Sequence, residues 1–461
     1  HLPIAFAKNY TSGKTRFRLT IPVGIRRLDR SGLTSEHLSP TTSHFQHRHF
    51  KTTSTLPHTK SSTMFFPKPL FHNPHVLPIA LVWLASTCAL SAELHPPEAT
   101  QAELAKASYA EEKTLKGLPT AFIDTSPNAE DGLAAGTLGI DGGEVDPILK
   151  FANEIAAGTH GEVDSLLISY HGKLLFESYF RRGRVNYPHY QMSITKSYTA
   201  LAIGRAIQCG YITMGDLDRP VCEFLKELEP SQFTEGAATI TLADVMTMRS
   251  GIRIPQNVQQ QIRSDTVKNQ GQHQVQMFFE RTAPIGSVPR EFKYQGIDPA
   301  ITMQVLEAVV PESAEAFLKK ELLQKLNVSQ FHWPEDISGL PKSAAGSSMR
   351  SRDMVKWGLL VRQHGQFNGE QLIPAAFIKR ATSALCAPSD TNSYGYFFWQ
   401  HTAMIEEMQT TCTTCRGAGG QFIFLFPKQD VVVIVTSHNK GMGPLLKTLP
   451  GRVLPFFPPT D

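Results

Sequence analysis

A serine and a lysine three residues apart, Ser193 and Lys196, are the pair in this sequence best suited to nucleophilic catalysis. Residues at i and i+3 lie on one face of a helix, so a helix beginning here places the lysine amine beside the serine hydroxyl. A lysine in that position can take the proton of a serine nucleophile. The spacing alone is weak, because Ser437-His438-Asn439-Lys440 repeats it at the end of a valine-rich run where no helix starts.

The residues after Ser193 predict the helix that this chemistry requires. Residues 193–207 are apolar around most of the helix circumference, which indicates that the helix is largely buried. Gly210 provides a ready stop. The apolar positions are Ala200, Leu201, Ile203, Ala206 and Ile207.

Two other segments contain groups that a serine nucleophile needs, namely a proton relay and an oxyanion hole. Tyr294 lies in a loop ahead of a predicted helix, where it can face a cleft. The glycine-rich run at 416–421 leads directly into an apolar strand, and its small residues let a substrate approach backbone N–H groups closely. Taken singly, the two segments also fit a core tyrosine with a satisfied hydroxyl and a flexible loop.

The elements that would position these groups favour an α/β (α+β) fold. Asp146-Pro147 begins a helix, with Asp146 as its N-cap, that ends at Gly158. Strands at 165–169 and 173–179 follow, joined by a hairpin turn at His171-Gly172. A strand pair that leads into a core helix indicates an antiparallel sheet flanked by helices.

The remaining segments predict a sheet completed by the C-terminal half of the chain. The sheet domain comprises residues 144–215 and 345–461, and a mostly helical subdomain at 216–344 is inserted into it. Within the subdomain, the polar stretch 256–276 has no aliphatic stripe and is expected to be an exposed excursion or a loop at the rim of a cleft. Helices are predicted at 241–248 (capped by Thr241), 299–309, 314–326, 352–361 (capped by Ser351) and 374–382, and strands at 394–400, 422–426 and 431–436.

The net charge of +4 arises in the first 63 residues, which hold ten basic and two acidic residues. The remaining residues carry 35 basic against 39 acidic side chains, so composition gives no reason to expect a nucleic-acid partner. Residues 1–63 are interpreted as a non-native or disordered extension, with a basic interaction tail as the alternative.

Residues 64–92 have the pattern of a secretory signal peptide. Lys68 supplies positive charge, residues 76–89 form an apolar run too short for a comfortable membrane span, and small residues follow it. We therefore expect an exported protein, periplasmic or secreted, with a lead-in segment at 93–143. A lipoprotein anchored through Cys88 is the alternative.

The cysteines do not form a disulfide framework, since five remain after Cys88 and they are sparse. Cys412 and Cys415 form one C-x-x-C, without the second pair that a zinc site requires and without the β-α-β context of a redox motif. They are interpreted as a local disulfide at a loop or as two unreactive thiols. No metal or other cofactor is expected.

In order and broad spacing, these segments resemble the β-lactamase-related serine hydrolases, which include penicillin-binding and class C β-lactamase-like proteins, esterases and 6-aminohexanoate-dimer hydrolases. The resemblance extends from about residue 117 to 440. Ser193-Ile194-Thr195-Lys196-Ser197 looks like the first family motif, Tyr294 matches the tyrosine of the second, and residues 417–421 resemble the third in its GxGGQ form. Residues 216–228, 240–251 and 345–358 are similar to other family segments.

The resemblance implies acyl transfer, with Ser193 as nucleophile, Lys196 as base and Tyr294 as proton relay. It places the oxyanion hole at the backbone N–H groups of Ser193 and Ala418. Gly417, Gly419 and Arg416 then become candidates for the substrate cleft.

Two departures from the family pattern narrow the expected substrate. The second motif is Tyr-Gln-Gly, so the asparagine that helps to hold a β-lactam amide is absent. Cys415-Arg416-Gly417 replaces Lys-Thr-Gly, so the cation for a substrate carboxylate is missing or is Arg416, whose side chain can also point away. Both favour hydrolysis of a small-molecule ester, amide or peptide. The alternatives are a D-amino-acid peptidase or β-lactamase, and a catalytically silent binding protein on the same fold.

Overall fold

The structure, a computed structural model, describes residues 95–405 and 408–459. Within these residues, no helix is both long and apolar enough to cross a membrane. The expected extension (1–63) and signal peptide (64–92) lie outside the described residues and stay predictions.

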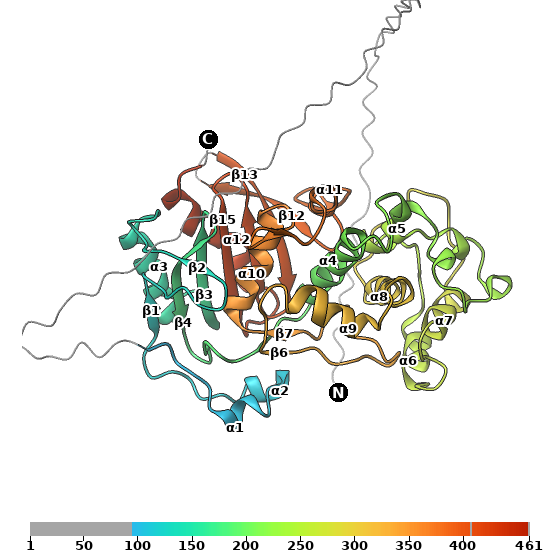
Figure 1. The fold of residues 1–461 in the computed structure, drawn as a ribbon, viewed down its shortest axis with the longest axis horizontal. Coiled ribbons are helices and arrows are strands. Elements are labelled where there is room, and N and C mark those ends of the chain that lie inside the picture. The colour runs from blue at the N-terminus through green and yellow to red at the C-terminus, as the bar shows by residue number, and fades with distance from the viewer. Residues whose placement is uncertain (1–94, 406–407, 460–461) are drawn as a thin grey trace, which may run out of the picture. The chain divides into compact units, whose positions relative to one another are not determined.

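A ten-stranded sheet forms the centre of the described part of the chain (Figure 1). Its strands are β1 (Phe122–Asp124), β2 (Ala134–Ala135), β3 (Val163–Tyr170), β4 (Lys173–Tyr179), β10 (Cys386–Ser389), β11 (Asn392–Tyr394), β12 (Trp399–Ile405), β13 (Met408–Gly417), β14 (Gln421–Phe426) and β15 (Val431–Ser437). They lie in the order β1-β4-β3-β15-β14-β13-β12-β11-β10. Every pair along this order is antiparallel, and the short β2 pairs in parallel with β4. The predicted antiparallel sheet is confirmed, and the pairing of β3 with β15 joins its N- and C-terminal parts.

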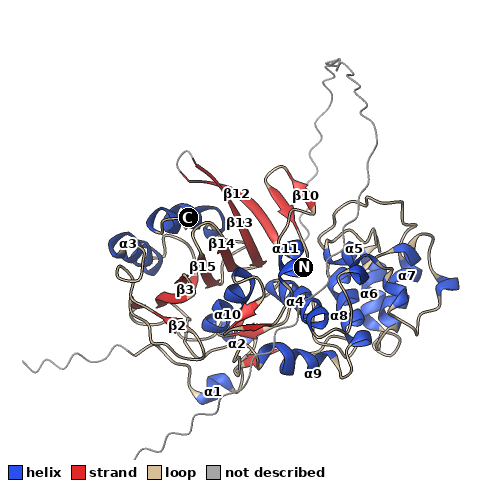
Figure 2. Ribbon diagram, turned by 45° about the horizontal axis from the view of Figure 1, so that its top comes forward, coloured by secondary structure: helices blue, strands red, loops and turns tan. Residues whose placement is uncertain are grey.

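Helices cover both faces of this sheet, as Figure 2 shows. α3 (Val145–Ala156) and α12 (Leu445–Val453) pack on one face, and α4 (Ile194–Gln208), α10 (Ser351–Arg362) and α11 (Ala375–Ala381) pack on the other. Alternate residues of the central strands point into the two cores. Because both faces are covered, the central strands are buried along nearly their whole length, which accounts for their runs of apolar residues.

Four more helices lie on the far side of α4 from the sheet (Figure 1), namely α5 (Leu242–Met246), α6 (Gln256–Ser264), α7 (His273–Arg281) and α8 (Ile297–Val309). The short α9 (Ala314–Leu318) follows α8 in the chain. α8 packs directly on α4, and the side chain of Thr241 caps α5 as predicted. The proposed boundaries of the sheet domain and the helical subdomain stay predictions.

The stretch 256–276 is largely exposed as expected, but the expectation of a loop there is wrong, because the stretch forms α6 and the start of α7. Their few apolar residues, which include Ile262, Val275 and Phe278, are buried in the core. Each helix is amphipathic with a narrow apolar stripe, and the many glutamines hide that stripe in the sequence.

The expectation of one strand at 394–400 is also wrong, because the chain turns between β11 and β12. A Cβ on Gly395 would lie 2.0 Å from the carbonyl oxygen of Ala381, and Phe397 has a φ of +60°. The aromatic run is therefore a tight turn that only a glycine at 395 permits. Two caps also differ, since Glu144 and Arg350 occupy the N-cap positions expected for Asp146 and Ser351.

Short elements complete the described chain. They are α1 (Gln101–Leu104), α2 (Tyr109–Glu112), β5 (His189–Tyr190), β6 (Phe331–His332), β7 (Ser348–Met349), β8 (Gln366–Phe367), β9 (Glu370–Gln371), a π-helical turn at Lys319–Leu323, and 3₁₀ turns at Gly215–Asp218, Val221–Glu223, Pro230–Gln232, Ala237–Thr239 and Leu454–Phe456.

The contact between α10 and the sheet generates a stability prediction. A Cβ on Gly358 would lie 2.5 Å from Val432 Cγ1 and 3.2 Å from Ile423 Cγ2. We expect Gly358→Ala to lower the free energy of unfolding, because overpacking costs about 1–3 kcal/mol and the helix-propensity gain returns only about 1 kcal/mol. Gly451→Ala in α12, where no atom lies within 4 Å of the added methyl group, should be neutral or stabilising. Urea unfolding measures both, and equal shifts would contradict the close packing of α10.

Candidate active site

The hydroxyl of Ser193 and the amine of Lys196 are in hydrogen-bonding contact. Lys196 Nζ donates to Ser193 Oγ at 2.9 Å and to the carbonyl oxygen of Ala344 at 2.6 Å. Ser193 occupies the N-cap position of α4, directly after Met192, whose φ of +51° is rare for a residue with a side chain. The predicted helix face therefore brings the two groups together, and the chain turns sharply just before the serine.

Burial of α4 holds this pair in place. Every residue from Ile194 to Ala206 is buried. The hydroxyl of Thr195 bonds the Met192 carbonyl at 2.7 Å and Ser347 Oγ at 2.9 Å. Since α4 is packed all round, its first turn has little freedom to move Ser193 away from Lys196.

Lys196 is 4% exposed, and neither of its hydrogen-bond partners carries a negative charge. Among the described residues, no carboxylate forms an ion pair with it. Burial therefore lowers the pKa of Lys196 to about 8. A substantial fraction of the amine is neutral at mildly alkaline pH, and the neutral amine can accept the hydroxyl proton of Ser193.

Tyr294 faces the same pair from the loop before α8. Its ring centroid lies 4.7 Å from Lys196 Nζ and 5.5 Å from the ring of Trp399. Burial raises the pKa of Tyr294, whereas a hydrogen bond with Ser193 and the charge of Arg416 act in the opposite direction. The residue is still 41% exposed, so it borders an open cleft and is not a core tyrosine.

The glycine-rich turn between β13 and β14 approaches the start of α4 closely. A Cβ on Gly417 would lie 2.4 Å from the carbonyl oxygen of Gln191, so only glycine allows this approach. The next residue, Ala418, is exposed. Among the described residues, the N–H groups of Ser193 and Ala418 donate to no other group. An oxyanion hole requires two free donors, so these two N–H groups stay the candidates for it.

The turn is held firmly, which excludes the flexible-loop interpretation. Gly419 N donates to the carbonyl oxygen of Gly441 at 2.7 Å, and Ser437 Oγ donates to the carbonyl oxygens of Gly419 and Gly420 at 2.5 and 2.8 Å. Gly419 and Gly420 have φ values of +88° and +90°. Gly419 therefore shapes the turn, and no contact marks it as a substrate ligand.

Arg416, the candidate cation, is tied down beside the cleft. Its guanidinium donates to Thr414 Oγ1, Asn392 Oδ1 and His401 Nδ1 at 2.7–3.1 Å, and it lies 4.9 Å from the ring centroid of Trp399. Burial lowers the pKa of Arg416 to about 10. The side chain is close enough to act on Tyr294 electrostatically, but its donors are engaged within the sheet.

A cavity of about 430 Å³ opens beside the catalytic candidates. It is bordered by Gly296, two residues after Tyr294, and by Ala344, the acceptor of the Lys196 amine. The sequence analysis identified none of the α6 and α7 residues that line it, although it allowed this stretch to form the rim of a cleft. The main lining residues are Ile262, Arg263, Gln274, Phe278, Ile297 and Ala300.

Three buried polar atoms near this cavity, Gln274 Oε1, Gln295 Oε1 and Asp298 Oδ2, make no hydrogen bond among the described residues. Gln274, which lines the cavity, is 4% exposed and its Oε1 makes no hydrogen bond. Asp298 accepts from Ser250 Oγ at 2.7 Å and Gln295 Nε2 at 2.9 Å, but its Oδ2 is unpaired. Burial raises the pKa of Asp298 to about 7, so this carboxyl carries a proton more readily than usual.

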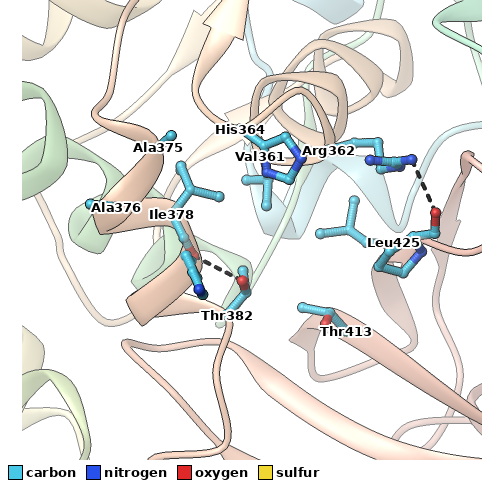
Figure 3. Close-up of a pocket in the computed structure, with 11 residues that line it drawn as sticks. Val361, Arg362, His364, Ala375, Ala376, Ile378, Thr382, Thr413 and Leu425 are labelled. Atoms are coloured by element: carbon cyan, nitrogen blue, oxygen red, sulfur yellow. Dashed lines mark hydrogen bonds between the residues drawn. The ribbon is translucent and has the colours of Figure 1, made fainter.

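A second cavity, of about 410 Å³, lies between α10, α11 and the sheet (Figure 3). Val361, Ile378 and Leu425 form its apolar walls, and His364 and Arg362 lie at one side. Arg362 is engaged with the carbonyl oxygen of Pro427 at 3.0 Å. None of the catalytic candidates lines this cavity, so we do not place the active site there.

The predicted local disulfide at 412–415 is wrong. Both cysteines lie within β13, not in a loop, and both are unpaired. Cys412 belongs to the core on one face of the sheet and Cys415 to the core on the other. Burial raises the pKa of each thiol, to about 12 for Cys415, which agrees with two unreactive thiols.

Comparison with known proteins assigns the chain to a family. The beta-lactamase family model matches residues 152–453, so the chain belongs to the beta-lactamase family. This membership indicates a serine hydrolase or acyl-transferase. A comparison with curated proteins finds no match.

Solved structures share the fold at low sequence identity. A Bacillus anthracis protein assigned as a 6-aminohexanoate-dimer hydrolase is 20% identical, with a TM-score of 0.51 over 69% of this chain and 86% of that one. FmtA from Staphylococcus aureus is 16% identical, with a TM-score of 0.51 over 68% and 91%. A class C beta-lactamase is 14% identical, with a TM-score of 0.50 over 64% and 91%. At these identities the likeness shows the fold and leaves the substrate open.

The burial of Lys196 predicts how the reactivity of Ser193 depends on pH. We expect its labelling by a fluorophosphonate to accelerate as the pH rises through about 8, because only the neutral amine accepts the hydroxyl proton. Below that value the rate should fall about tenfold per pH unit. Lys196→Met should label about 10²–10⁴-fold more slowly. A wild-type rate that stays constant from about pH 6 to about pH 9 would contradict this role of Lys196.

Proposed function

We propose that this protein hydrolyses an ester or amide bond of a small molecule through an acyl-enzyme on Ser193. The observation that carries the proposal is the contact of Lys196 Nζ with Ser193 Oγ at 2.9 Å, in a site where burial lowers the pKa of the amine to about 8. A lysine kept charged by a carboxylate could not act as a base, and this lysine has no such partner among the described residues.

The reaction begins when Ser193 Oγ attacks the substrate carbonyl carbon and its proton passes to Lys196 Nζ. Negative charge develops on the carbonyl oxygen, where the N–H groups of Ser193 and Ala418 stabilise it. Collapse of the tetrahedral intermediate breaks the bond to the leaving group, which takes a proton from Lys196 through the hydroxyl of Tyr294. Water then attacks the acyl-enzyme with the same groups acting in reverse, which releases the acid and restores Ser193.

The shape of the site favours open-chain esters and amides over β-lactams. Gly296 stands where relatives carry the asparagine of the second motif, and Cys415 is buried where they carry the lysine of the third. Neither residue can offer a side-chain hydrogen bond to a β-lactam amide or carboxylate. The cavity behind Gly296 instead has room for an acyl or leaving-group chain, with apolar side chains such as Ile262, Phe278 and Ile297 among its polar ones.

Substitution of the nucleophile tests this function directly. We expect the wild-type protein to hydrolyse p-nitrophenyl butyrate and to be labelled by a fluorophosphonate, and Ser193→Ala to lose at least about 10³-fold in kcat/KM because the acyl-enzyme cannot form. Ser231→Ala, which changes an exposed serine, is the control.

Three results would overturn or redirect the proposal. Equal ester hydrolysis by wild type and Ser193→Ala would remove Ser193 from the mechanism. Turnover of nitrocefin faster than of short esters would assign the protein to the β-lactamases. A folded wild type that is neither labelled nor active on esters, amides or nitrocefin would favour a silent binding protein.

The cavity beside Gly296 yields a specificity prediction. A Cβ at this position would lie 3.5 Å from Ala344 Cβ, an ordinary contact, so a larger side chain must project into free space. We expect Gly296→Leu to raise KM for p-nitrophenyl hexanoate about 10-fold or more and to leave the acetate little changed, because the new side chain fills the cavity. Gly286→Leu, at an exposed position with no atom within 4 Å of the added Cβ, is the control for general effects of the substitution. Equal KM changes for both esters would place the acyl chain elsewhere.

A further inference from the structure

A glutamate from the N-terminal segment is buried close to the residues that lead into α4. Glu112 is 2% exposed and is the buried residue of the short helix α2. It precedes the segment matched by the family model by 40 positions. Its Oε2 accepts from the backbone N–H of Tyr190 at 3.0 Å, three residues before Ser193.

Hydrogen bonds hold the N-terminal segment against residues 185–187, which lie shortly before Ser193 in the chain. Asn186 Oδ1 accepts from Ala99 N at 2.7 Å, and Val185 N donates to the carbonyl oxygen of Pro97 at 2.9 Å. Leu115 and Tyr187 pack together in a small separate core. These contacts hold Glu112 in place as part of the folded unit.

Glu112 forms an ion pair with His189, which links it to Gln421. His189 Nδ1 faces Glu112 Oε1, and His189 Nε2 lies 2.7 Å from Gln421 Oε1. The backbone of Ser437 fixes the orientation of the Gln421 amide, because its N–H donates to Oε1 at 3.0 Å and its carbonyl oxygen accepts from Nε2. Both nitrogens of His189 therefore face oxygen acceptors, which suits an imidazolium donating in both directions.

The surroundings favour this charge. Burial opposes it, but Glu112 and the more distant Asp164 raise the pKa of His189 above its usual value. Asp164 is itself paired with His438 Nδ1 at 2.6 Å, and Arg182 lies 3.5 Å from Asp164 on the other side. The ring of His438 stands edge-on to that of His189 at 5.3 Å. The titratable and charged groups around His189 are thus Glu112, Asp164, His438 and Arg182, and His438 Nε2 also lies 3.8 Å from Glu112 Oε1.

Gln421 is the last residue of the turn that carries the oxyanion donor. Its Nε2 also reaches the carbonyl oxygen of Ala418 at 3.4 Å, and Ser437, to which it is bound, holds the carbonyl oxygens of Gly419 and Gly420. The orientation of the Ala418 N–H depends on how these hydrogen bonds fix the peptide groups of the turn. A chain of polar contacts therefore runs from Glu112 through His189 and Gln421 to the turn.

We propose that Glu112 and His189 are positioning residues that hold the Gly417–Gln421 turn, and with it the Ala418 N–H, in the geometry that stabilises the oxyanion. The inference rests on the proposed function, since it presupposes an oxyanion at Ala418. Loss of the Glu112 charge leaves His189 neutral over more of the pH range, and its hydrogen bond to Gln421 Oε1 then loses its charge assistance and becomes weaker. The turn can relax by a few tenths of an ångström, which weakens a bond needed mainly in the transition state.

The test compares two neighbouring glutamates. Glu112→Gln should lower kcat for p-nitrophenyl butyrate about 10-fold, less than the 10²–10³-fold that loss of a whole oxyanion donor costs, with KM changed less than about twofold. Glu111→Gln, which alters an exposed glutamate of the same helix, should have no effect. Glu112→Asp, which keeps the charge, should restore part of the kcat and serves as the second variant if Glu112→Gln folds poorly. Circular dichroism and thermal unfolding establish that each variant is folded at the assay temperature.

A pH profile and a double-mutant cycle separate positioning from a merely structural role. The kcat defect of Glu112→Gln should grow as the pH rises, because His189 without its carboxylate loses its proton at lower pH than in the wild type. Addition of Glu112→Gln to Gln421→Met should cause little further loss, because both act through one chain of contacts.

Opposite outcomes are informative. A defect that is independent of pH, additive with Gln421→Met, or equal to that of Glu111→Gln in an active enzyme would overturn the inference. An inactive, unlabelled wild type would instead overturn the proposed function.

Discussion

The Lys196 amine is buried away from water, and no carboxylate compensates its charge among the described residues. The rest of the site depends on this constraint. A buried ammonium is costly unless paired, so the side chain must be allowed to lose its proton. The chain meets this requirement with two neutral acceptors, Ser193 Oγ and the carbonyl oxygen of Ala344. One comes from the same helix and the other from a segment almost 150 positions away. The base therefore exists only when the helical region is packed against α4.

The glycine-rich turn, which carries the candidate oxyanion donor Ala418, depends on the sheet. β13 and β14 deliver the glycine-rich turn to the start of α4, and Gly417 lets their backbones meet. The sheet can do this because β15 pairs with β3, which closes the C-terminal strands onto the hairpin that precedes α4. An error in this register would rotate the turn away from Ser193. The catalytic geometry is thus a consequence of long-range strand pairing as much as of the local S-x-x-K spacing.

Patterns that are local in the sequence could be predicted, and features that depend on packing between distant segments could not. The β3–β4 hairpin, α4 and its glycine stop, and the Thr241 cap follow from periodicity and turn chemistry. The sequence did not predict α6 and α7, because a helix that covers a cavity needs only a few apolar residues to pack against the core. The tight turn at Gly395 was hidden because aromatic residues there read as a strand. His189 and Glu112 gave no signal at all, since nothing in either neighbourhood indicates that the two side chains meet.

The buried Glu112–His189 pair also indicates how a member of this family can fix the geometry of its active site with residues of its own. An ion pair in a protein interior is weak grounds for stability, because desolvation offsets much of the attraction. Its retention beneath a catalytic turn is easier to understand if it fixes one orientation of the Gln421 amide, which an apolar pair could not do. Glu112 reaches that position from a segment preceding the residues matched by the family model. The geometry of the oxyanion hole is then controlled partly by a residue outside the segment that the family model matches.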